Sequence, residues 1–81
     1  MALCFLHLRD GTDQILDPDG TEYPSVEAMR EDVLACARDL ISADVKHGVV
    51  DLRFRIDVED EGGAIVYTLP FKSAFSIILE A

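Results

Sequence analysis

Five acidic residues fall within thirteen positions near the start of the chain, so a cation-binding loop is the first chemistry to consider. They are Asp10, Asp13, Asp17, Asp19 and Glu22, and residues 17–24 read D-P-D-G-T-E-Y-P. An EF-hand loop needs oxygen ligands at positions 1, 3, 5 and 12 and glycine at position 6. With Gly20 at position 6, positions 1 and 12 are Ile15 and Val26, which supply none. The segment is therefore predicted to be a type I turn, with a weak divalent-cation site as an alternative.

The two cysteines and two histidines are the next candidates, for metal binding or catalysis. Cys4 and His7 are three positions apart on an expected strand, so their side chains point to opposite faces. Cys36 and His47 would lie about 16 Å apart along an expected helix. Neither pair can share an ion, and no nucleophile signature accompanies His7. We therefore predict no catalytic residues, no metal ligands and no cofactor, and expect that the protein is not an enzyme.

A pair of carboxylates on the expected strand at residues 52–59 is a further candidate. This segment alternates apolar and charged residues, and the charged ones are Arg53, Arg55, Asp57 and Glu59. Alternation of this kind predicts a half-buried strand with a solvated outer face. Asp57 and Glu59 are accordingly predicted to lie in solvent beside the two arginines rather than in a catalytic site.

The charge balance narrows the classes of partner. The chain has 7 basic and 16 acidic residues, a formal charge of −9, and its basic residues are scattered. Nucleic-acid binding needs a basic stripe, so it is not expected; an acidic surface suits a basic protein partner. No apolar run approaches the roughly 20 residues of a membrane span, and the start lacks the positive region of a secretory signal. We expect no membrane association and a cytoplasmic location.

The apolar pattern predicts which elements position these residues. Strands are expected at residues 3–8, at 14–16 or 21–23, at 52–59 and at 64–69, where Pro70 ends the last. A helix is expected from the Ser25 cap to Lys46, stopped by Gly48. Its apolar stripe consists of Met29, Val33, Cys36, Ala37, Leu40 and Ile41. The prediction is one α+β domain over residues 1–81, a two-layer β-β-α-β-β fold with an antiparallel-rich sheet and one long amphipathic helix on one face.

Surplus apolar residues predict an interface. The strand at residues 3–8 is apolar on both faces, whereas one helix covers only one face of a sheet. The tail at residues 72–81 is apolar as well, and its conformation is open. The predicted interface residues are Leu3, Phe5, Phe75, Ile77, Ile78 and Leu79. A symmetric homodimer is the commonest way to cover such a surface.

Four motifs in a fixed order carry a resemblance to a known family. An aromatic strand runs into R-D-G at residues 5–11, D-x-x-G-x-E-x-P occupies residues 17–24, an alanine-rich helix follows, and L-P-F stands at residues 69–71. The chain resembles a family of short uncharacterised proteins found mainly in alphaproteobacteria. This resemblance covers nearly the whole chain and implies no activity and no catalytic residues. The apolar tail is longer than its members usually have.

Residues 3–46 also resemble the antitoxin half of HicA–HicB-type toxin–antitoxin pairs. Both place a hairpin, a proline and the S-x-E-A start of a helix in this order. This likeness implies a regulator that masks a basic partner. Three functions thus remain open: a self-associating interaction module, an antitoxin-like binder of a basic protein, and a weak divalent-cation binder.

Overall fold

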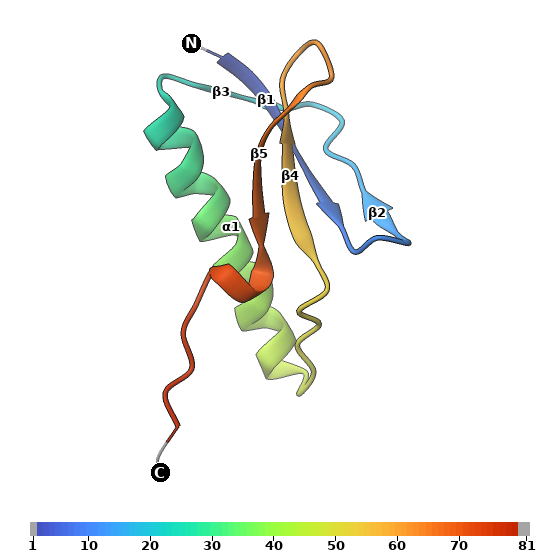
Figure 1. Ribbon diagram of the computed structural model, residues 1–81, viewed down its shortest axis with the longest axis vertical. Helices are drawn as coiled ribbons and strands as arrows, with labels where there is room; N and C mark the ends of the chain where they lie inside the picture. Colours follow the sequence, from blue (N-terminus) through green and yellow to red (C-terminus); the bar gives the residue numbers. More distant parts are fainter. Residues whose placement is uncertain (1, 80–81) are drawn as a thin grey trace.

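The computed structural model describes residues 2–79 and has the predicted α+β class (Figure 1). Met1, Glu80 and Ala81, which belong to the predicted single domain and to the tail, lie outside the described residues. The elements, in chain order, are β1 (Ala2–Arg9), β2 (Gln14–Ile15), β3 (Thr21–Tyr23), α1 (Val26–Lys46), β4 (Arg55–Glu59), β5 (Ile65–Pro70) and the 3₁₀ helix η1 (Phe71–Ser73). Both segments proposed for the second strand form short strands.

The five strands make one antiparallel sheet. Its order is β2-β1-β4-β5, and β3 pairs with β1 as well. The register places His7 of β1 opposite Asp57 of β4, and Asp57 opposite Thr68 of β5. Because side chains alternate along a strand, these three residues lie on one face of the sheet. A bulge at Val58 and Glu59 interrupts the pairing of β4 with β5.

Helix α1 covers the opposite face of the sheet (Figure 1). It begins as predicted, with the Ser25 hydroxyl accepting a hydrogen bond from the Ala28 N–H at 3.1 Å. Its buried residues are Met29, Val33, Ala37 and Ile41, which pack against Cys4, Ile56, Val58, Leu69 and Phe71. Leu40 was predicted in this stripe but is 40% exposed, because it lies at the edge of the contact. The helix stripe and the inner face of the sheet thus form the core.

The strand predicted at residues 52–59 is shorter than the sequence indicates. Residues 52 and 53 form a turn, and β4 begins only at Arg55. The Asp51 carboxylate accepts from the Arg53 N–H at 3.0 Å and bends the chain there. Leu52 is consequently 41% exposed and lies outside the sheet.

Candidate functional site

A network of charged side chains lies on the face of the sheet opposite α1. Arg9 Nη1 donates to Asp57 Oδ2 at 3.0 Å, and Arg55 Nε lies 3.2 Å from the same carboxylate. The Thr68 hydroxyl donates to Asp57 Oδ1 at 2.9 Å. Asp57 therefore holds together side chains from β1, β4 and β5 while it is only 2% exposed.

This burial corrects the prediction of a solvated charged face. Asp57 and His7 are both buried, and Glu59 is half-buried. The alternating pattern of residues 52–59 marked this face as charged but did not show that the charges compensate one another. Two arginines and a hydroxyl replace the water that Asp57 loses, which is the condition for burying a carboxylate.

The environment of Asp57 determines its protonation. Burial is the largest influence and raises the pKa of Asp57, but hydrogen bonds from Arg9 and Thr68 and the charge of Arg55 together outweigh it. The pKa of Asp57 therefore lies below its ordinary value. The carboxylate stays ionised, as its role as a triple acceptor requires.

His7 connects this network to the acidic turn. Its Nδ1 accepts from the Asp17 backbone N–H at 3.1 Å, and its Nε2 lies 2.5 Å from Glu59 Oε2. Since a backbone N–H can only donate, Nδ1 must be the unprotonated nitrogen in this arrangement, and Nε2–H donates to Glu59. Both ring nitrogens are thus engaged, and His7 has none left for a substrate. The geometry suits a structural histidine and not a general base.

The segment D-P-D-G is the turn that its residues predict. Asp17 Oδ1 accepts from the N–H groups of Asp19 and Gly20 at 3.2 and 3.1 Å, which closes an Asx turn. Asp17 Oδ2 accepts from the Leu6 N–H at 3.2 Å. Burial raises the pKa of Asp17, but these three backbone donors outweigh it, so that pKa also lies below its ordinary value.

Gly20 allows this turn to close over β1. Its φ is +74°, and a Cβ there would lie 2.9 Å from the Phe5 ring. The Phe5 ring in turn stacks on His7, with centroids 6.4 Å apart and planes 12° apart. Phe5, predicted as an interface residue, is therefore half-buried beneath the chain's own turn.

The carboxylates of the acidic segment accept hydrogen bonds from the backbone. That of Asp10 accepts from the N–H groups of Thr12 and Asp13, and that of Asp17 accepts as described above. Within residues 2–79 no three His, Cys, Asp or Glu side chains are grouped as ligands. Burial raises the pKa of the Cys4 thiol, as the Asp60 carboxylate also does, and burial likewise raises that of Cys36. Both thiols stay protonated, which makes them poor ligands.

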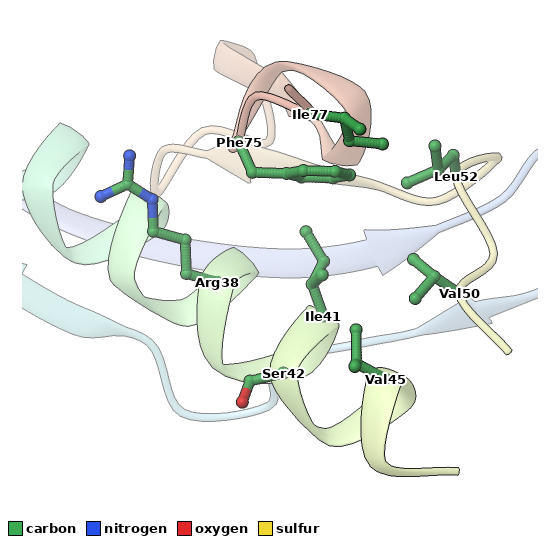
Figure 2. Close-up of a pocket in the computed structure, with 8 residues that line it drawn as sticks. All are labelled: Arg38, Ile41, Ser42, Val45, Val50, Leu52, Phe75 and Ile77. Carbon is green, nitrogen blue, oxygen red and sulfur yellow. The ribbon is translucent and has the colours of Figure 1, made fainter. Parts of the chain in front are cut away.

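An apolar groove lies beside the last turns of α1 (Figure 2). Its volume is about 470 Å³. It is lined by Arg38, Ile41, Ser42, Val45, Val50, Leu52, Phe75 and Ile77. Of these, Val45 is 60% exposed and Ile77 is 67% exposed, so the apolar walls face solvent. A groove of this size is in the range of ligand and peptide sites.

The six predicted interface residues lie in two places. Leu3 and Phe5 are half-buried on β1, on the outer face of the sheet. Phe75 and Ile77 line the groove, and the remaining two follow them in the tail, where Ile78 is 95% and Leu79 83% exposed. The sequence did not indicate that Val45, Val50 and Leu52 would line a groove together with the tail. Residues 52 and 53, which form a turn, were predicted to belong to a strand.

Fold and site together define a small α+β domain with a compensated polar face and an open apolar groove. The chain belongs to the family described as a domain of unknown function, DUF6894, whose model matches residues 3–72. Residues 73–79, which include the groove residues Phe75 and Ile77, lie beyond the match. No curated protein and no solved structure matches the chain significantly.

In the part of the chain that the structure describes, no helix has both the length and the apolar character needed to cross a bilayer.

Proposed function

We propose that this protein is a non-catalytic cytoplasmic interaction module that binds a second copy of itself. The observation that carries the proposal is the apolar groove beside an exposed apolar tail. Ile77, Ile78 and Leu79 are 67%, 95% and 83% exposed, and they follow one another directly. Contiguous exposed apolar surface of this kind marks interaction sites in small proteins. The order of its sequence motifs supports an origin among the short alphaproteobacterial proteins that it resembles.

The polar face supports the non-catalytic part of the proposal. A general base or nucleophile needs a free atom directed at a substrate. Both nitrogens of His7 are occupied, and Asp57 accepts from three side chains. Within residues 2–79 no buried side-chain nitrogen or oxygen lacks a hydrogen-bond partner. These groups stabilise the sheet and leave none poised for chemistry.

Size-exclusion chromatography with light scattering across a dilution series tests the proposal. We expect a species of about twice the 9.0 kDa chain mass that dissociates on dilution. A mass of one chain at every concentration, up to the millimolar range, contradicts self-association.

A basic protein partner is the second candidate, and the charge of −9 favours it. Acidic side chains are exposed along α1, at Glu27, Glu31, Asp32 and Asp39. Complementary charge accelerates the encounter with a basic protein, in the manner of an antitoxin that masks its toxin. Affinity capture from native lysate at low salt, eluted with increasing salt, tests this function. Recovery of no basic protein counts against it.

A further inference from the structure

We propose that two copies of this chain exchange their C-terminal tails, each seating Ile78 in the apolar groove of the other copy. This inference rests on the self-association proposed above and specifies how it occurs. It follows from four features of the described residues: how the tail is anchored, where its side chains point, how large the groove is, and how the two are related in one chain.

The tail is fixed at its root and unsupported beyond it. Phe71 and Ala74 are buried, and Arg38 Nε donates to the Ala74 carbonyl oxygen at 2.8 Å. Phe75 is half-buried against the core. After this point the chain runs away from the helix and the sheet (Figure 1). The anchored segment thus directs the tail outward, into solvent (Figure 1).

Ile78 does not enter the groove of its own chain. Phe75 and Ile77 form one wall of that groove (Figure 2). In an extended segment successive side chains point to opposite sides, so Ile78 points away from the groove that Ile77 lines. Its exposure of 95% agrees with this direction. Ile78 is therefore available to another molecule.

The groove has the size and the chemistry for this side chain. A dry cavity on the order of 150 Å³ lined by aliphatic residues holds one benzene-sized group. A groove of about 470 Å³ therefore accommodates two or three branched aliphatic side chains. Its walls at Ile41, Val45, Val50 and Leu52 are aliphatic, which matches isoleucine.

One chain carries both halves of the contact, so the exchange closes on itself. Each copy presents one tail and one groove, and a two-fold axis satisfies both at once. The groove wall includes the root of the outgoing tail, so the two tails of the pair run side by side. The dimer accumulates a formal charge of −18, twice the −9 of one chain. Added salt screens this repulsion and strengthens the exchange, whereas it weakens binding to a basic partner.

The first experiment measures the dimer dissociation constant by sedimentation equilibrium for full-length variants. We expect Ile78→Ser to raise it about a hundredfold, because each dimer loses the burial of two such side chains. Val45→Gln, on the groove wall, is expected to raise it at least tenfold for the same reason. Ile78 is so exposed that its replacement leaves the fold of a single chain unchanged.

Matched substitutions elsewhere control for the loss of apolar surface. Ile15 on β2 is 67% exposed, and Val26 at the start of α1 is 57% exposed, close to the 60% of Val45. Neither lines the groove. Ile15→Ser and Val26→Gln are expected to leave the dissociation constant within about threefold of the wild type, since they remove no contact of the exchange.

A synthetic peptide of residues 75–81 separates tail docking from other dimers. We expect it to dissociate the wild-type dimer, and the same peptide with serine in place of Ile78 to have no effect.

Each outcome is informative. A wild-type chain that is monomeric at all concentrations overturns both self-association and the exchange. A wild-type dimer that is insensitive to Ile78→Ser and Val45→Gln overturns the exchange alone. Loss of the dimer with Ile78→Ser but not with Val45→Gln, or a dimer that weakens with salt, also overturns the groove as the place where the tail docks.

Discussion

The outer face of the sheet and the apolar groove differ in where their side chains find partners. On the sheet, the ionisable side chains of His7 and Asp57 are buried, and each has partners within the chain. At the groove, aliphatic side chains of α1 and the loop before β4 remain in water beside an equally apolar tail. The first region has its partners within one chain, whereas the second is completed by another molecule in the exchange proposed above. In that proposal the aliphatic residues, and not the ionisable ones, carry the function.

The largest difference between the two regions is expected when Asp57, at the centre of the polar network, is replaced. We expect Asp57→Ala to destabilise the protein by about 3–5 kcal/mol, because it removes the nearest counter-ion of the half-buried Arg9 and leaves it the more distant Glu59, at 3.8 Å. Urea unfolding followed by circular dichroism measures the loss. Asp51→Ala is the matched control: Asp51 also pairs with an arginine two residues away, but Arg53 is 79% exposed. The control should lose much less stability, because it removes only an exposed ion pair and one hydrogen bond in the turn that Asp51 forms, and equal losses in both variants would contradict a special role for the outer face.

Gly20→Ala tests how the turn is held against the same face. The φ of +74° strains any side chain, and the new Cβ meets the Phe5 ring at 2.9 Å. We expect a loss of about 2–3 kcal/mol, the sum of a left-handed residue and an overpacked contact. Gly63→Ala has a φ of +83° but nothing within 4 Å of the new Cβ, so about 1–2 kcal/mol is expected. The difference between the two variants, in urea unfolding, measures the Phe5 contact, and no difference would show that the ring moves aside.

Lowering the pH should destabilise the polar face of the sheet before it affects the groove. The pKa values of Asp57 and Asp17 lie below the ordinary value of 3.8 in the folded chain, so the unfolded chain binds protons first as the pH falls. Their contribution to stability is therefore fully present above that ordinary value and is lost as the pH falls through the lower folded values. A stability–pH profile from urea midpoints checks the window, and Asp57→Asn should flatten it. A profile that declines well above the ordinary carboxyl value contradicts this account.

The smallest effect on stability is expected at the groove. Val45 is 60% exposed in the single chain, so Val45→Gln should change the unfolding free energy of the monomer by less than about 0.5 kcal/mol. Urea unfolding at a concentration where the chain is monomeric is the measurement. The same substitution is expected to weaken association strongly under the proposed exchange, which is the reverse of the expectation for Asp57→Ala. A groove variant that unfolds the monomer would make the groove part of the core.

Residue periodicity predicted the fold because each element has one clear signal. The Ser25 cap, the stripe at three- and four-residue spacing and Gly48 fix α1 almost to the residue. The turn at Asp17 was equally clear, since proline and glycine constrain the backbone locally. The limits of β4 were not predicted, because the Asp51 side chain that turns the chain at Arg53 competes with a perfect alternating pattern.

The sites were predicted only in part, because both depend on pairing across long stretches of chain. Asp57 is buried since Arg9 lies beside it, 48 positions earlier in the sequence, and no local pattern contains that fact. The tail was recognised as surplus apolar sequence, but its neighbours Val45 and Val50 became a groove only through the packing of η1 on α1. Sequence therefore identified the apolar excess and not the surface that would receive it.

The contact between Asp17 and Leu6 bears on how the protein tolerates high concentration. Along β1, residues 2–4 pair with β3 and residues 8–9 pair with β2, which leaves a gap around Leu6. A free backbone donor in such a gap is a starting point for edge-to-edge aggregation. The Asp17 carboxylate occupies that donor, and its negative charge repels any strand that approaches with its carbonyl oxygens. One turn residue thus occupies the backbone donor at which a strand of another chain could otherwise add to β1.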